Sequence, residues 1–204
     1  MQEENSCELC DDLYLNDTIK IGDQVPDLPF KVFHENDEKE MSISDFKDKW
    51  LILFFYPADF TFVCPTELEE MAGLYEEFKK EGAEVVSVST DTVYTHKAWY
   101  DTSDAIKKIK FPMAEDANHM LSELFGVLIE DEGLALRGSF IIDPNGVLRT
   151  IEINDNNIGR NAKELLRKLQ AAKFTHEHGD KVCPASWNPG DDTLEPGMDL
   201  VGKI

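Results

Sequence analysis

The chain has 204 residues, of which 42% are hydrophobic, and this is enough to build one domain with a substantial core. It carries 20 lysines and arginines against 41 aspartates and glutamates, and the resulting formal net charge of −21 argues against nucleic acids and anionic membrane surfaces as partners. Because the longest apolar run, residues 50–56, is too short to span a membrane and the acidic start has no signal-peptide core, we expect a cytoplasmic protein.

The first elements are expected to be a tail and a hairpin. Residues 1–20 are polar, acidic and weakly patterned, which predicts a mobile tail. Two short runs, 28–33 and 39–44, flank a polar turn and predict an N-terminal hairpin. Ser44 is predicted to cap a single helical turn after the hairpin.

Strands and helices then alternate along the chain. Continuous apolar runs predict strands that are covered on both faces, and an apolar repeat every three to four residues predicts helices. In chain order we expect a strand at 50–57, a helix at 67–82, a strand at 83–90, a helix at 91–103, an extended segment at 111–118, a helix at 119–127, a hairpin at 137–153 and a helix at 159–174. Beyond Phe174 the periodicity is lost, which predicts an extended C-terminal arm. This order is typical of an α/β domain with a central mixed sheet and helices on both faces.

Cys64 lies where a predicted core strand gives way to a predicted helix. Proline is favoured at the first position of a helix, and it disfavours helical angles in the residue before it. Pro65 is therefore expected to be the first helical residue, and Cys64 is predicted to be the N-cap. The free N–H groups and the positive end of the helix dipole stabilise a thiolate at such a position. From position alone, a buried cysteine that only fills the core is the alternative interpretation.

The five histidines give Cys64 no partner close in the sequence, although proximity in space stays open. Cysteine hydrolases pair the thiolate with a base that later protonates a leaving amine. Attack on the O–O bond of a peroxide needs no such amine, and it yields a sulfenic acid that condenses with a second thiol. Cys183, in the predicted C-terminal arm, is the candidate for that second thiol.

Residues 55–67, FYPADFTFVCPTE, resemble the active-site segment of the two-cysteine peroxiredoxins. The family pattern Pro-x-x-x-Thr-x-x-Cys falls on Pro57, Thr61 and Cys64. The later segments STDTVYTHKAWY, EDEGLALRGSFIIDPNG, IGRNAKELLRKLQAAKF and VCPASW resemble the family in the same order. The ending, LEPGMDLVGKI, is similar to that of the bacterial alkyl hydroperoxide reductase C branch, and the match runs from about residue 21 to the end of the chain.

The resemblance implies a thioredoxin-like fold and a thiol-dependent peroxidase that reduces hydrogen peroxide and organic hydroperoxides in antioxidant defence. It implies that Cys64 is the peroxidatic cysteine, that Thr61 holds its thiolate and the substrate oxygen, and that Pro57 shields the thiolate from water. Arg137, in LRGSF, matches the arginine that steadies the thiolate and the polarised peroxide. A guanidinium suits that role because it carries a permanent charge and fixed donors.

Further roles are implied by the same resemblance. Glu67 and Arg160 match a carboxylate and an arginine that orient the groups around the thiolate, and Cys183 matches the resolving cysteine. The resemblance selects a disulfide between Cys64 of one subunit and Cys183 of another, whereas the sequence alone also permits pairing within one chain. It implies no cofactor and no metal, a homodimer that assembles into a decameric ring, and reduction by a flavoprotein NADH-dependent disulfide reductase or by thioredoxin.

Together these features divide the chain into three parts: a tail at 1–20, a thioredoxin-like peroxiredoxin domain at 21–173, and an arm at 174–204 that carries Cys183. Eukaryotic members prone to overoxidation have a Gly-Gly-Leu-Gly loop and a C-terminal Tyr-Phe helix. This chain has Asp-Glu-Gly-Leu at 131–134 and no Tyr-Phe ending, so we expect a scavenger rather than a peroxide-sensitive signalling protein.

Three other interpretations remain open at this point. A thioredoxin-type oxidoreductase needs a second cysteine three residues after Cys64, where the chain has Glu67, and an oligomeric holdase would keep its function in a Cys64→Ser variant. The pair Cys7 and Cys10 has Cys-x-x-Cys spacing without a strand before it, and we expect it to be dispensable for turnover. A zinc site is also conceivable. Its ligands would be Cys7, Cys10, His176 and His178.

Overall fold

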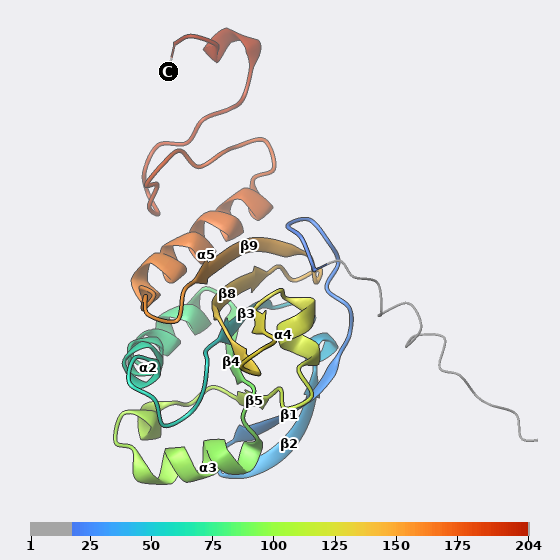
Figure 1. Ribbon diagram of the computed structural model, residues 1–204. Coiled ribbons are helices and arrows are strands. Elements are labelled where there is room, and N and C mark those ends of the chain that lie inside the picture. Colours follow the sequence, from blue (N-terminus) through green and yellow to red (C-terminus); the bar gives the residue numbers. More distant parts are fainter. Residues whose placement is uncertain (1–17, 204) are drawn as a thin grey trace, which may run out of the picture.

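A seven-stranded mixed sheet forms the centre of the computed structural model, which describes residues 18–203 (Figure 1). The strand order is β2-β1-β5-β4-β3-β8-β9. The strands are β1 (Pro29–His34), β2 (Asp37–Ser42), β3 (Trp50–Phe55), β4 (Ala83–Ser89), β5 (Met113–Glu115), β8 (Arg137–Ile142) and β9 (Leu148–Asn154). Strands β3, β4 and β5 are parallel to one another, and the outer strands join them antiparallel. A separate two-stranded sheet pairs β6 (Leu128–Ile129) with β7 (Leu134–Ala135).

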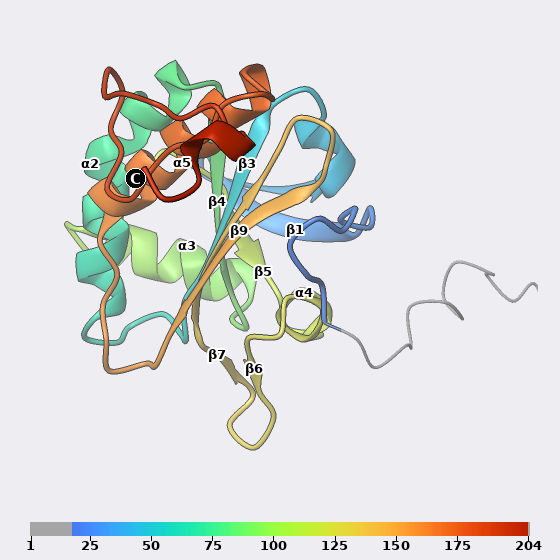
Figure 2. The same ribbon diagram turned by 90° about the horizontal axis from the view of Figure 1, so that it is seen from above.

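Helices cover both faces of this sheet, as predicted (Figures 1 and 2). The helices are α2 (Cys64–Lys80), α3 (Val93–Thr102), α4 (Met120–Leu124) and α5 (Ala162–Glu177), with 3-10 turns η2 (Ile43–Phe46), η3 (Ile106–Lys108) and η4 (Met198–Leu200). Helices α2, α3 and α5 pack in one apolar cluster, whereas α4 and η2 pack in a second cluster on the other face. No helix within residues 18–203 is long and apolar enough to cross a membrane.

The apolar run of β3 explains why the sheet is covered on both sides. Successive side chains of a strand point to opposite faces, and all six residues of β3 are buried. Ile52 and Phe54 join the α2–α5 cluster, while Leu51, Leu53 and Phe55 join the α4 cluster. Strand β3 is therefore packed between the two apolar clusters along its whole length, and this fixes the position of its C-terminal end at Phe55.

The two predicted hairpins form, but the first one is tighter than expected. Its turn contains only Glu35 and Asn36, both at positive φ, so His34 and Asp37 pair with each other inside the strands. A two-residue turn with both residues at positive φ matches the twist of the flanking strands. The second hairpin joins β8 to β9, and Gly146 at φ +81° closes its turn.

The predicted cap at Ser44 is wrong. The 3-10 turn η2 begins at Ile43, and its N-cap is Ser42, two residues before the predicted cap, in a reciprocal box with Asp45. The backbone N–H of Ser42 donates to Asp45 Oδ2 at 2.7 Å. Ser44 instead donates its backbone N–H to Asp27 Oδ1 at 2.9 Å, so a carboxylate distant in the sequence takes up this group.

The segment after α5 is more ordered than the extended arm that the sequence predicts. Helix α5 continues three residues past Phe174, to Glu177. Val182 and Leu194 then form an antiparallel bridge, which closes residues 182–194 into a loop, called here the C-terminal loop. Figure 1 shows this segment leaving the body beyond the end of α5.

Candidate active site

Cys64 is fully buried at the first turn of α2, directly after the end of β3 and a short connecting loop. The predicted N-cap is wrong by one residue, because Val63 already has helical angles and caps the helix. Cys64 is thus the first helical residue and Pro65 the second. The thiol still lies in the first turn of the helix, where backbone N–H groups lack partners within the helix.

Arg137 brings a positive charge to this thiol. Strands β3 and β8 are antiparallel neighbours, so the end of β3 and the start of β8 lie at the same edge of the sheet. Arg137 is the first residue of β8, and its Nη1 lies 3.4 Å from Cys64 Sγ. Its Nε donates to the backbone carbonyl of Asn156 at 3.0 Å, which fixes the plane of the guanidinium.

Glu67 connects Arg137 with a second buried arginine. Arg137 Nη1 donates to Glu67 Oε2 at 2.6 Å. Arg160 donates to Glu67 Oε1 from its backbone N–H at 2.7 Å and from Nε at 3.0 Å, and its Nη2 reaches Oε2 at 3.1 Å. Burial raises the pKa of Glu67, but the hydrogen bonds and charge of Arg160 outweigh it and hold that pKa below its ordinary value.

Arg160 is itself fixed on its remaining sides. Its Nη1 donates to the carbonyl of Gly138 at 2.6 Å and to Ser139 Oγ at 3.1 Å. The guanidinium carbon lies 3.4 Å from the centre of the Phe54 ring, a stacked cation–π arrangement. Burial lowers the pKa of Arg160, and Glu67 opposes this effect.

Cys64 lies beside an excess of buried positive charge. Two guanidinium groups and one carboxylate leave one excess positive charge beside Cys64. Buried charges are costly unless they are paired. The excess positive charge beside the sulfur is a place where a bound anion is stabilised, and it is supplied without a histidine.

Pro57 and Thr61 lie in the loop between β3 and α2. Pro57 is buried, and Thr61 is half-buried. Thr61 Oγ1 donates to the carbonyl of Ala58 at 2.9 Å, so in this arrangement the hydroxyl has its lone pairs left to accept a hydrogen bond. The resemblance-based role for Thr61, holding the thiolate and the substrate oxygen, stays a prediction.

Cys183 lies in the C-terminal loop, against the last turns of α5. Its Sγ is 3.9 Å from the carbonyl oxygen of Ala171. Burial raises the pKa of the Cys183 thiol, and the charge of Arg167 opposes that rise. Cys64 and Cys183 are both free thiols here. Cys7 and Cys10 lie outside the described residues, so the prediction that they are dispensable and the zinc interpretation that uses them stay untested.

Sequence reasoning missed a buried polar cluster beneath the same loop. Asp59 Oδ2 lies 2.8 Å from His96 Nδ1, and Tyr56 donates to Asp59 Oδ1 at 2.7 Å. The backbone N–H of Asp59 donates to Asp91 Oδ2 at 2.7 Å. Burial lowers the pKa of His96, but Asp59 outweighs it and raises that pKa. The available signal was positional: Asp59 and Asp91 each come after a buried strand, and parallel strands end at one edge of a sheet.

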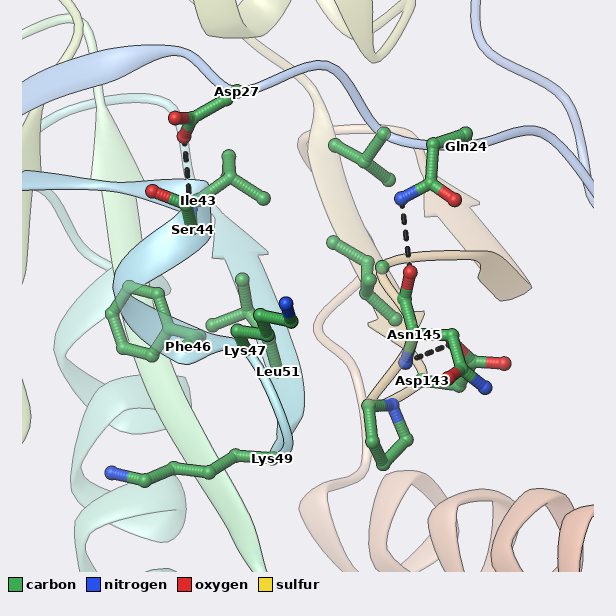
Figure 3. A pocket seen from close by; sticks show the side chains of 14 residues that line it. Gln24, Asp27, Ile43, Ser44, Phe46, Lys47, Lys49, Leu51, Asp143 and Asn145 are labelled. Carbon is green, nitrogen blue, oxygen red and sulfur yellow. Dashed lines mark hydrogen bonds between the residues drawn. The ribbon is translucent and has the colours of Figure 1, made fainter.

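A pocket of about 320 Å³ lies at the opposite end of the sheet (Figure 3). It is lined by Leu51, near the start of β3, and by Ile142, at the end of β8, whereas Cys64 comes after the end of β3. On its rim, Gln24 Nε2 donates to the carbonyl of Asn145 at 3.0 Å. This pocket is therefore separate from the thiol.

The thiol, its arginine and its carboxylate occur in a chain whose sequence matches a known family. Residues 21–151 match the AhpC/TSA family, and residues 171–199 match the C-terminal domain of 1-Cys peroxiredoxin. The chain belongs to the AhpC/TSA family. The second match includes Cys183, so in this family member that C-terminal segment carries a thiol.

Relatives and solved structures agree with this assignment. Alkyl hydroperoxide reductase C of Pseudomonas aeruginosa is 52% identical over 178 residues, which cover 86% of this chain and 95% of that protein. The protein of the same name from Escherichia coli is 49% identical over the same shares of the two chains. The crystal structure of Enterococcus faecalis AhpC has a TM-score of 0.79 and 50% identity, and it covers 80% of this chain and 98% of its own. The reduced 2-Cys peroxiredoxin of Plasmodium vivax has a TM-score of 0.84 and 32% identity, with shares of 88% and 94%.

The predicted family and the predicted thioredoxin-like fold are thus confirmed. The chain is a peroxiredoxin, a thiol-dependent peroxidase. The holdase was the non-enzyme alternative, and an enzyme is what the relatives show. The thioredoxin-type interpretation is also disfavoured, because Glu67, at the position where that class needs a second cysteine, is bound to two arginines.

Proposed function

We propose that this peroxiredoxin reduces hydrogen peroxide and organic hydroperoxides in antioxidant defence, with Cys64 as the attacking thiol. The contact of 3.4 Å between Cys64 Sγ and Arg137 Nη1 carries the proposal. The thiolate attacks the terminal peroxide oxygen, an S–O bond forms and the O–O bond breaks. The alkoxide or hydroxide that leaves takes up a proton and becomes an alcohol or water. The sulfur is oxidised to sulfenic acid while the peroxide is reduced.

Arg137 acts on this step through its charge and its fixed position. The guanidinium stabilises the thiolate before the attack and the negative charge that develops on the leaving oxygen. Glu67 and Arg160 keep it in that position, since Glu67 binds both arginines. Thr61 contributes the lone pairs of its hydroxyl, which accept a hydrogen bond from the incoming peroxide, and Pro57 keeps water from the thiolate.

Cys183 resolves the sulfenic acid in a second step. Its thiolate attacks Cys64 Sγ of another subunit, the S–O bond breaks, and hydroxide leaves as water with the proton that Cys183 has released. The product is an intersubunit disulfide. A disulfide requires the two Cα atoms to lie within about 7 Å, so we expect that the first turn of α2 has to unwind locally and that the arm carrying Cys183 has to move as well.

Two exposed apolar surfaces support a homodimer that assembles into a decameric ring. Strand β9 forms one edge of the sheet, and Ile153 on it is 41% exposed, with Ile158 at 58% just beyond. Pairing of two such edges makes a symmetric dimer. In the loop before α2, Phe60 and Phe62 are 56% and 92% exposed, and they provide a second surface through which dimers associate.

The cycle also needs a reductant that opens the disulfide. A flavoprotein NADH-dependent disulfide reductase or thioredoxin fits this need, and a reducing compartment such as the cytoplasm keeps both thiols available. In this proposal residues 21–173 form the catalytic domain and residues 174–204 form an arm that presents Cys183. The predicted tail at 1–20 is too long, because Ile19 is buried in the core and donates its backbone N–H to the carbonyl of Leu124 at 3.0 Å.

Stopped-flow oxidation by hydrogen peroxide tests the assignment of Cys64. A Cys64→Ser variant should lose rapid peroxide reduction, and Arg137→Ala should slow the first oxidation by about 100-fold, as is typical when one stabilising donor is removed. Cys183→Ser serves as the control, because it should keep the first oxidation at the wild-type rate. Unchanged oxidation in Cys64→Ser would show that another group reacts with the peroxide.

A further inference from the structure

The C-terminal loop contains a single buried side chain. Among residues 182–194 it is Trp187 alone that is buried, at 4% exposure, whereas Cys183 is half-buried and most of the other side chains are exposed. The bridge between Val182 and Leu194 closes the loop on itself through backbone hydrogen bonds of 2.9 and 3.1 Å. The loop is therefore a closed unit, and one indole ring provides its apolar attachment to the rest of the chain.

Trp187 packs on Phe174, which lies in the last turn of α5. The two ring centres are 5.0 Å apart, and the ring planes are inclined by 45°. The ring of His178 also stacks on Phe174, with a distance of 4.3 Å between the ring centres and an angle of 13°. The indole Nε1 donates to the carbonyl of Asp191 at 3.1 Å, so docking leaves no polar group of the indole without a partner.

The docked loop holds Cys183 against the same helix. Cys183 Sγ lies 3.9 Å from the carbonyl oxygen of Ala171, and Arg167 Nη1 donates to the backbone carbonyl of Trp187 at 2.8 Å. Arg167, Ala171 and Phe174 follow one another at intervals of four and three residues, so they lie on one face of α5. The thiol is therefore held on this face, partly sheltered, as long as Trp187 is docked.

Release of Cys183 has to separate the two rings. In the proposed cycle the arm that carries Cys183 moves before the disulfide with Cys64 forms. Trp187 lies four residues after Cys183, inside the same closed loop, so a movement of the loop carries both residues together. The contact between Trp187 and Phe174 is thus broken each time the thiol leaves α5.

We propose that Phe174 and Trp187 are positioning residues whose contact is a latch, and that this latch sets how often Cys183 is released from α5. The inference rests on the proposed role of Cys183 as the resolving thiol. While the loop is docked, the sulfenic acid at Cys64 persists, and a second hydroperoxide molecule can react with it. The strength of the latch therefore divides oxidised Cys64 between disulfide formation and overoxidation.

The overoxidation step transfers one further oxygen atom. The sulfenic sulfur of Cys64 attacks the terminal oxygen of the second hydroperoxide, so a second S–O bond forms and the O–O bond breaks. The sulfur is oxidised to sulfinic acid, and the peroxide is reduced to alcohol or water. Because this step consumes peroxide and disulfide formation does not, the ratio of the two products reports the rate of release at a known peroxide concentration.

Alkylation of Cys183 measures its release directly. The reduced full-length protein is treated with iodoacetamide at fixed pH, and modification is followed by mass spectrometry of the peptide that contains Cys183. Trp187→Leu and Phe174→Leu should each raise the rate by about two- to tenfold, as expected for the loss of one aromatic pair. Phe174→Tyr keeps the ring and should leave the rate near that of the wild type.

The consequence for catalysis is measured in the same variants. Disulfide formation after one equivalent of hydrogen peroxide should accelerate by the same factor as alkylation. The peroxide concentration that converts half of Cys64 to sulfinic acid should rise by that factor too. The first oxidation of Cys64 should keep the wild-type rate, which a general loss of structure would not preserve. Met198→Ala is the matched control, because it removes a side chain of the same arm that is 88% exposed, and it should change none of these quantities.

A double variant tests whether the two rings act as a pair. Both substitutions remove the same contact, so Trp187→Leu combined with Phe174→Leu should release Cys183 at most about twofold faster than the faster single variant. If the two single effects multiply instead, the rings hold the loop through separate contacts, and the latch is wrong as defined here.

The outcomes separate this inference from the proposed function. If Cys183→Ser leaves resolution intact, Cys183 is not the resolving thiol and the proposed function is wrong on that point. If Cys183→Ser abolishes resolution while both leucine variants resolve at the wild-type rate, the latch does not control resolution and the inference is wrong. Slower resolution in the leucine variants would also overturn it, because the docked loop would then present Cys183 to Cys64 rather than hold it back.

Discussion

Single residues from three distant parts of the chain create the environment of Cys64. Glu67 lies one helical turn after it, Arg137 begins a strand 73 residues later, and Arg160 lies in the loop before α5. Glu67 binds both arginines, so all three side chains are held in place by other protein groups. The reactivity of the thiol therefore depends on contacts that are also part of the folded core.

Glu67 is the residue whose loss should cost the most stability. In Glu67→Gln two buried guanidinium groups lose their common carboxylate, and removal of one partner of a buried ion pair typically costs about 3–5 kcal/mol. We expect a loss of this size in the free energy of unfolding, measured by urea denaturation at pH 7. Glu164→Gln is the control, because its partner Arg167 lies near the surface and the loss there should stay below about 1 kcal/mol.

The pH dependence of this effect has a defined sign. The folded-state pKa of Glu67 lies below its ordinary value, so its stabilisation is complete above an unfolded-state pKa of about 4.3 and is lost as pH falls through the folded value. The difference in stability between wild type and Glu67→Gln should therefore shrink in acid below about pH 4. A difference that stays constant down to pH 2 would contradict the ionic origin of the effect.

Sequence reasoning reached some of these residues and not others. Cys64 stood out by itself, since a proline comes after it at a strand–helix junction. Arg137, Glu67 and Arg160 were identified only through resemblance, because nothing in their local pattern distinguishes a buried arginine from a solvated one. The pairing of Asp59 with His96 was missed, since it depends on which strands become neighbours in the sheet.

At the scale of elements, the strands and turns whose residue pattern has a strong physical cause were predicted well. The apolar run of β3 and the Asn-Gly turn between β8 and β9 gave correct elements. Two helix starts were predicted wrongly. Ser44, the predicted cap, binds Asp27 from a distant part of the chain while Ser42 caps η2, and Val63 caps α2 because its own backbone already has helical angles. The extension of α5 past Phe174 likewise depends on the later packing of Trp187 against that residue.

The β8–β9 turn requires a glycine at position 146, and this requirement can be tested. The φ of Gly146, +81°, is strained for any residue with a side chain, and an added Cβ would lie 2.4 Å from Gln24 Nε2. Gly146→Ala should lower the free energy of unfolding by about 1–2 kcal/mol. Gly73→Ala is the matched control, because it lies in α2 with no atom within 4 Å of the new Cβ and should gain about 0.5–1 kcal/mol. Equal effects of the two substitutions in thermal unfolding would contradict the assigned turn.

At the scale of the whole molecule, the proposed cycle joins two chains. In a symmetric dimer one contact between Cys64 and Cys183 generates its twin, so two bridges form. Peroxide treatment should therefore give a dimer band on non-reducing denaturing gels, and Cys183→Ser should lose that band and accumulate sulfenic acid at Cys64. A monomer that carries an internal Cys64–Cys183 bridge by mass spectrometry would contradict the intersubunit mechanism.

The charge balance at Cys64 also bears on the fate of the helix after each oxidation. A thiolate completes the set of two arginines and one carboxylate, whereas a sulfenic acid is neutral and leaves one buried positive charge without its counterpart. In the proposed cycle, oxidation of Cys64 would therefore weaken the packing of the first turn of α2 at the step in which Cys64 has to reach Cys183. Reduction of the disulfide would restore the negative charge and, with it, the pairing that stabilises this turn in its folded form.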